Sequence, residues 1–187
     1  MYKLAALLFL ALAACASSEQ QGDVESAQAD NSALRELYEQ DQADRSDDSI
    51  DWRQVSRRDS LRRVRVRELL DANQVATSED YRHAAMVFQH GSDTTAAWLA
   101  FDLAERAVEL DSSNADAKWL MAAAWDRYQM RRGEPQWYGT QFVKDPPDSP
   151  WRLYDIDTTK VSDEDRRRLG VRSLAEARAH VASMNAP

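Results

Sequence analysis

The sequence has little cysteine, glycine, proline or histidine: one Cys, five Gly, five Pro and three His in 187 residues. A single cysteine cannot close an internal disulfide, so the fold must be stabilised by a packed core. The sequence lacks H-E-x-x-H, C-x-x-C, phosphate-binding glycine-loop and G-x-S-x-G motifs. His83 and His90 are seven residues apart, two turns along a predicted helix, which is too far to chelate one metal ion. No metal site and no cofactor is predicted.

No apolar run is long enough to cross a membrane. The longest one, residues 4–14, follows Lys3 and precedes Cys15, and it has the length and small residues of a secretory signal. Residues 12–15, L-A-A-C, resemble a bacterial lipobox, which implies cleavage before Cys15 and acylation of its thiol. A plain secretory signal that leaves an unused thiol is the alternative. We therefore predict a signal peptide over residues 1–14 and a lipid anchor at Cys15.

The anchor predicts an envelope lipoprotein that faces the periplasm. The two residues after Cys15 are Ala16 and Ser17, and neither is acidic. By resemblance to known lipoprotein sorting, this favours the outer membrane over the inner membrane. From Cys15 to residue 32 the chain is mostly Ser, Gln, Glu, Asp and Ala, a composition that predicts a disordered tether.

The remaining residues, 33–187, are enough for one domain with a sizeable core. We expect the six tryptophans of the chain to supply much of that core. The net charge of −8 argues against nucleic acid as a partner. The expected partners are the membrane, through the anchor, and an envelope protein or a small ligand.

Apolar residues recur at helical spacing through most of this domain, and no sustained alternating strand pattern occurs. The predicted helices cover about 34–45, 51–73, 77–90, 94–110 and 115–132, with two short ones after Ser162 and Ser173. The third is apolar almost all round near Ala84, which predicts a central position. Pro146, Pro147 and Pro150 predict an extended strap without regular ladders. The fold class is therefore all-α, a single helical bundle with a C-terminal strap.

Residues 104–118, A-E-R-A-V-E-L-D-S-S-N-A-D-A-K, resemble the junction between two helices of tetratricopeptide repeats. Only one copy is present, and a solenoid needs at least about three stacked units. We therefore expect a local helical hairpin at this point.

The second predicted helix is strongly basic, although the chain as a whole is acidic. One interpretation is contact with lipid phosphates or another anionic polymer. The other, which we favour from the sequence, is a solvated face paired with acidic residues such as Asp59, Glu68 and Asp71. The arginines concerned are Arg57, Arg58, Arg62, Arg63, Arg65 and Arg67.

A polar-aromatic loop follows the fifth predicted helix, which ends at Gly133. The loop, residues 136–141, offers amides, a phenol and a hydroxyl. Together with polar residues at two helix ends, it forms the candidate site. The candidate residues are His90, Asp126, Arg127, Gln136, Tyr138 and Gln141.

Three motifs in this region carry a resemblance: the pair Gln89-His90, the pair Asp126-Arg127, and the run G-x-P-Q-x-Y-G-T-Q from Gly133 to Gln141. They resemble a bacterial family of domains of unknown function, over most of the chain from about Leu34 onward. The resemblance implies a shared fold. It leaves open whether a site is shared, and it says nothing about a substrate.

Two classes of function fit the candidate residues. A binding or protein-interaction module would use them to hold a ligand or only to satisfy the buried backbone of the loop. A metal-independent hydrolase would use His90 as acid or base, Asp126 to orient it, and Arg127 to stabilise an oxyanion or phosphate. Because no activated nucleophile is apparent, water would have to attack. We favour the binding or structural hypothesis over catalysis.

Overall fold

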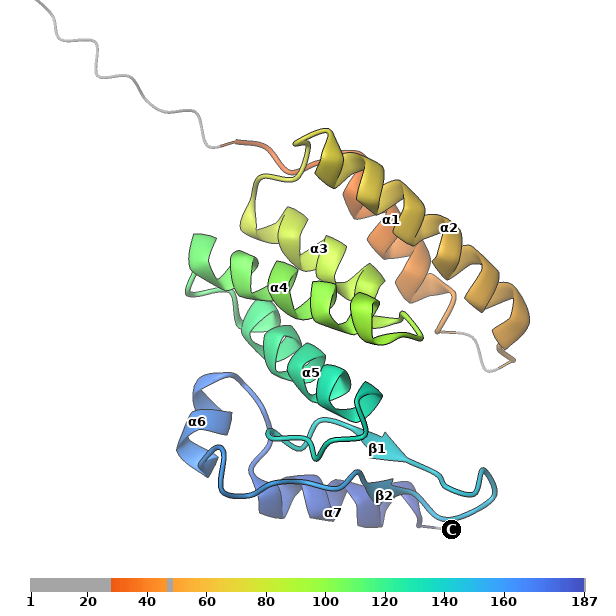
Figure 1. The fold of residues 1–187 in the computed structure, drawn as a ribbon, viewed down its shortest axis with the longest axis vertical. Coiled ribbons are helices and arrows are strands. Elements are labelled where there is room, and N and C mark those ends of the chain that lie inside the picture. The colour runs from red at the N-terminus through yellow and green to blue at the C-terminus, as the bar shows by residue number, and fades with distance from the viewer. Residues whose placement is uncertain (1–27, 47–48, 187) are drawn as a thin grey trace, which may run out of the picture.

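The computed structural model describes residues 28–46 and 49–186. Within this part of the chain there are seven helices and one two-stranded sheet (Figure 1). The elements are α1 (Ser32–Ala43), α2 (Trp52–Asp71), α3 (Ser78–Gln89), α4 (Thr94–Leu110), α5 (Ala115–Arg131), β1 (Phe142–Val143), β2 (Arg152–Leu153), α6 (Asp163–Arg168) and α7 (Leu174–Met184). The predicted all-α bundle is confirmed. The predicted signal peptide, Cys15 and most of the predicted tether lie outside the described residues.

The helices begin where polar side chains cap them. The N-cap residues of the five main helices, α1 to α5, are Asn31, Asp51, Thr77, Asp93 and Asn114. Each accepts a hydrogen bond from a backbone N–H of the first turn, which would otherwise lack a partner. Ser162 and Ser173 form complete capping boxes with Asp165 and Glu176, which confirms the two short C-terminal helices.

Helix α3 is the centre of the bundle, as predicted. It packs against α1, α2, α4 and α5 (Figure 1), and Ala84, Ala85 and Val87 on it are fully buried. Helices α4 and α5 form the predicted hairpin. At its turn, Asn114 Nδ2 donates to Glu79 Oε1 at 2.8 Å, so the hairpin is joined to the start of α3.

The tryptophans do not supply the core, and that expectation was wrong. The exposed fractions of Trp52, Trp98 and Trp119 are 63%, 44% and 40%. The buried side chains of α4 are mostly alanines, and α5 also buries four alanines against its neighbours. Small side chains let these helices approach closely, so the large rings lie at the rim of the helix contacts.

The segment after α5 runs beneath the bundle (Figure 1). Strands β1 and β2 pair antiparallel, with Phe142 opposite Leu153 and Val143 opposite Arg152. This short ladder corrects the expectation that the prolines forbid strand pairing. All three prolines lie between the strands, where no ladder hydrogen bond is required of them.

None of the helices that the structure describes is both long enough and apolar enough to span a membrane.

Candidate functional site

Asp126 holds the polar-aromatic loop in place. Its side chain is fully buried on α5, and its carboxylate accepts from the backbone N–H groups of Trp137 at 2.8 Å, Tyr138 at 2.9 Å and Thr140 at 2.9 Å. The hydroxyl of Thr140 donates a fourth bond at 2.8 Å. Burial raises the pKa of Asp126, and these donors oppose that rise. Both carboxylate oxygens are occupied, so Asp126 acts as an anchor for the loop.

The two glutamines of the loop complete this network. The fully buried Gln136 donates from Nε2 to the carbonyl oxygens of Gln141 at 3.0 Å and Tyr154 at 2.9 Å. Its Oε1 accepts from the N–H of Gln141 at 2.8 Å. Gln141 Nε2 in turn donates to the carbonyl of Ala123 on α5 at 3.2 Å. The amides therefore satisfy buried backbone groups and join the loop to α5 and to the strap.

Arg166 of α6 supports the same loop and was missed by the sequence analysis. Its guanidinium is buried and donates to the carbonyl oxygens of Tyr138 and Trp137, both at 2.9 Å. The only sequence signal for it is its place within the short helix that Ser162 begins. Burial also raises the pKa of the half-buried Tyr138, so that phenol is protonated at neutral pH.

His90 lies elsewhere and has a different carboxylate partner from the one expected. It is the C-cap of α3, and its Nδ1 lies 2.9 Å from Oδ2 of Asp41, which is fully buried on α1. The expected pairing of His90 with Asp126 does not form, because Asp126 is occupied by the loop. A carboxylate only accepts, so Nδ1 carries the proton in this contact. Among the described residues, nothing hydrogen-bonds to Nε2 of His90.

Asp41 was also missed, although the sequence holds a signal for it. It stands seven residues after the buried Leu34, on the same inward face of α1. A carboxylate at such a position must be paired, because an isolated buried charge is too costly. Here Arg45 supplies the second partner, with Nη1 of Arg45 at 3.0 Å from Oδ1 of Asp41.

This ion pair belongs to a network that joins α1 to α2. Arg45 also contacts Asp59 at 2.6 Å, Arg62 contacts Asp59 at 2.9 Å, and Arg62 also pairs with Asp44. The buried acids and arginines of the network therefore compensate one another.

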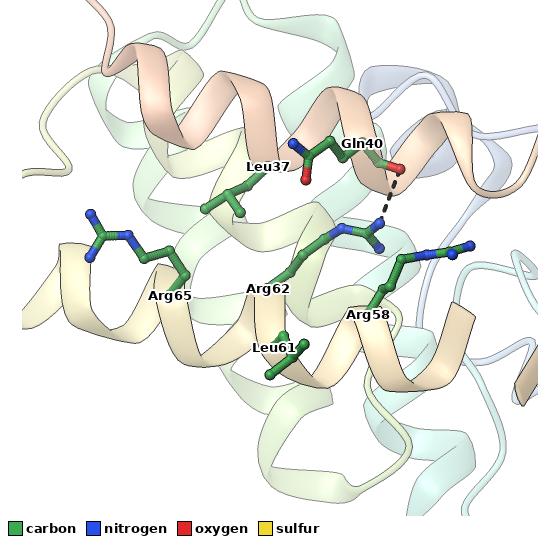
Figure 2. A pocket seen from close by; sticks show the side chains of 6 residues that line it. All are labelled: Leu37, Gln40, Arg58, Leu61, Arg62 and Arg65. Atoms are coloured by element: carbon green, nitrogen blue, oxygen red, sulfur yellow. Dashed lines mark hydrogen bonds between the residues drawn. The ribbon is translucent and has the colours of Figure 1, made fainter. Parts of the chain in front are cut away.

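A pocket of about 280 Å³ lies against this helix pair (Figure 2). It is lined by Leu37, Gln40, Arg58, Leu61, Arg62 and Arg65. Each of its three guanidinium groups already has an acidic partner: Arg58 pairs with Asp44, Arg62 with Asp59, and Arg65 with Glu68. The pocket therefore offers an anion little uncompensated positive charge.

Arg127 differs from these paired arginines. It lines a second pocket, of about 420 Å³, where the end of α1 meets the first turns of α2, His90 of α3, and α5. Within residues 28–46 and 49–186, no side chain or backbone group forms a hydrogen bond or ion pair with Arg127, and its Nε is buried. Burial lowers the pKa of Arg127 to about 10, with smaller contributions from Arg131 and Arg45. The lining residues are Arg45, Trp52, Val55, Ser56, Asp59, His90 and Arg127.

The six candidate residues therefore fall into two groups. Asp126, Gln136, Tyr138 and Gln141 belong to the loop network, whereas His90 and Arg127 line the 420 Å³ pocket. Successive residues on a helix point about 100° apart, which is why Asp126 and Arg127 serve different faces of α5. In the part of the chain that the structure describes, no three His, Cys, Asp or Glu side chains are placed to hold a metal ion.

Comparisons with protein-family models, with curated proteins and with solved structures found no match to this chain.

Proposed function

We propose that this protein is a binding module whose 420 Å³ pocket, hereafter the Arg127 pocket, takes a small ligand bearing a carboxylate or phosphate group. The observation that carries the proposal is the guanidinium of Arg127, which is largely buried and has no acidic partner among the described residues. A buried cation without a counter-ion costs stability. A bound anion would remove that cost and accept two parallel hydrogen bonds from the planar guanidinium.

The other lining groups suit the same ligand. Asp41 holds the ring of His90 through Nδ1, which leaves Nε2 for a polar atom of the ligand. Ser56 adds a hydroxyl, and Trp52 and Val55 add apolar surface. Among the lining residues that the structure describes, Asp59 has the one acidic side chain. It is already paired with Arg45 and Arg62, so it repels an incoming anion weakly.

The cellular setting is part of the proposal. The predicted lipid anchor at Cys15 and the tether that follows would hold the helical domain at the periplasmic face of a membrane, with the outer membrane favoured. The Arg127 pocket would then meet periplasmic metabolites, or an acidic side chain of an envelope protein.

A metal-independent hydrolase is a second candidate, and the pair of Asp41 and His90 favours it. In that mechanism Asp41 takes the orienting role first expected of Asp126, and Nε2 of His90 removes a proton from water. Arg127 stabilises the developing negative charge. Hydrolysis of p-nitrophenyl acetate and p-nitrophenyl phosphate that is lost in His90→Gln would support this activity.

Isothermal titration of inorganic phosphate and of succinate into the full chain tests the binding proposal. Arg127→Gln removes the charge with little change in size. Arg35→Gln is the matched control, since Arg35 is exposed near the far end of α1. We expect Arg127→Gln to weaken binding at least tenfold and Arg35→Gln to leave it unchanged. If neither probe binds the wild-type chain, or if both variants bind as well as it does, the proposal is wrong.

A further inference from the structure

Helix α2 carries a concentration of positive charge in an acidic protein. Its 20 residues include seven arginines and three acidic residues, a net charge of +4, whereas the whole chain carries −8. The helix lies at the edge of the bundle and packs on α1 and α3 (Figure 1). The side of α2 turned away from those helices is therefore open to solvent.

The arginines of α2 divide into a paired set and an unpaired set. Arg58, Arg62 and Arg65, which line the pocket of Figure 2, all have acidic partners. Among the residues that the structure describes, no acidic side chain pairs with any of the other four. They are Arg53, Arg57, Arg63 and Arg67, of which Arg63 donates to Ser60 and Arg67 lies over the ring of Phe88. The expectation of an internally paired face thus holds for only part of the helix.

Two large apolar side chains lie on the exposed side of α2, close to Arg57. Leu61 and Val64 are exposed by 66% and 59%. On a helical projection Val64 stands nearly opposite the buried Val55 and Val66, with Arg57 beside it. A face that only had to stay solvated would favour polar residues here, since exposed apolar area in contact with water is unfavourable. Of the acids near this face, Glu68 is paired with Arg65 and Asp71 lies at the end of α2.

We propose that the outer face of α2, defined by Arg53, Arg57, Leu61 and Val64, docks on the surface of an anionic lipid bilayer. Unpaired guanidinium groups attract lipid phosphates, and the two apolar side chains reach into the headgroup region. The acidic remainder of the chain is repelled by the same surface, so the charge asymmetry orients the domain with α2 toward the lipid. The contact is peripheral, because the apolar core face of α2 stays packed on the bundle.

This inference is independent of the Arg127 pocket and does not need an acyl group at Cys15. Co-sedimentation of the full chain with vesicles tests it, using phosphatidylcholine alone and phosphatidylcholine with about one-third phosphatidylglycerol. Variants are compared with the wild type at the same N-terminus, so any contribution from residues 1–27 cancels. Each arginine near a charged bilayer contributes about fivefold in affinity.

The test variant is Arg53→Gln with Arg57→Gln. The control is Arg172→Gln with Arg178→Gln, which makes the same change in charge at two exposed positions beside and within α7, on the opposite side of the molecule (Figure 1). We expect the test variant to lose about 25-fold in affinity for anionic vesicles and the control to keep the wild-type affinity. Val64→Ser, at an exposed position, is expected to weaken binding severalfold with no change in the circular dichroism spectrum.

The proposal further requires that the difference in affinity between the wild type and the test variant disappear on neutral vesicles, and also when salt is raised from about 50 to about 500 mM. An equal loss of affinity for anionic vesicles in the test variant and in the control would overturn the proposal, since net charge alone would then account for binding. A loss of affinity in the test variant that is as large on neutral vesicles as on anionic ones would also overturn it. So would binding to heparin with none to anionic vesicles, which would assign the face to a different polyanion.

Discussion

Replacing Asp126 with asparagine tests whether the polar loop is held by this carboxylate. The substitution keeps the size and one acceptor oxygen, but it places an NH₂ group where an oxygen accepted before. If the remaining oxygen keeps the N–H groups of Trp137 and Tyr138, then the N–H of Thr140 faces a donor and loses its partner. The hydroxyl of Thr140 can rotate and accept from the new amide, so one buried donor is left unsatisfied.

The cost has two parts. A buried N–H without a partner costs about 1–3 kcal/mol, and each of the two retained bonds changes from charge-assisted to neutral at about 0.5–1 kcal/mol. We therefore expect Asp126→Asn to lower the free energy of unfolding by about 2–5 kcal/mol. Asp102→Asn, on the solvent side of α4, is the matched control and should change it by less than about 0.5 kcal/mol.

Urea unfolding followed by circular dichroism measures both variants at neutral pH. Hydrogen exchange adds a local signal, since the N–H of Thr140 should lose most of its protection in Asp126→Asn. A loss below about 1 kcal/mol, with protection of Thr140 retained, would refute the assignment of Asp126 as the anchor of the loop.

Three further predictions follow from buried or strained positions and from the N-terminus. Burial and the neighbouring Arg82 lower the pKa of His83, so the free energy of unfolding is at its full value above the unfolded pKa of about 6.5. It falls as the pH drops from there toward the folded pKa, by at most about 1.4 kcal/mol per pH unit. Urea unfolding at pH values from 7.5 to 5 should show this slope, and His83→Gln should flatten it. Gly139→Ala should lower the free energy of unfolding by about 2–3 kcal/mol, and Gly133→Ala by about 1 kcal/mol. Both glycines have a positive φ, but only a Cβ at position 139 would contact Ile156, at 3.3 Å. Equal losses in the two variants would contradict this. Cys15→Ser should release the protein from the membrane fraction of cells, and a variant that stays bound would disprove the anchor.

The sequence predicted the helices well because capping residues and apolar spacing are local signals. Ser162, for example, meets its partner Asp165 three residues along, and the same holds for Ser173 and Glu176. The central position of α3 followed for the same reason, from apolar residues on all its faces.

The candidate site was only partly predictable, because its contacts join residues far apart in the chain. The contact of His90 with Asp41 spans 49 residues. The inward position of Asp41 on α1 indicates that this carboxylate needs a partner, but it does not identify His90 as that partner. The prediction that the tryptophans supply the core was wrong for a related reason. How closely two helices pack depends on the small side chains of both helices, which the sequence of one helix alone does not show. The polar loop was recognised, but only the structure shows that its amides are used internally.

The measurement that tests the central claim most directly is the unfolding free energy of Arg127→Met against wild type, with and without inorganic phosphate. Removing a largely buried charge that has no described partner should leave the ligand-free protein as stable as wild type or raise its stability by about 1–3 kcal/mol. At 100 times its dissociation constant, phosphate should stabilise the wild type by about 2.7 kcal/mol and the variant not at all. An Arg127→Met variant that is destabilised by more than 1 kcal/mol, and that phosphate stabilises as much as the wild type, would contradict the account.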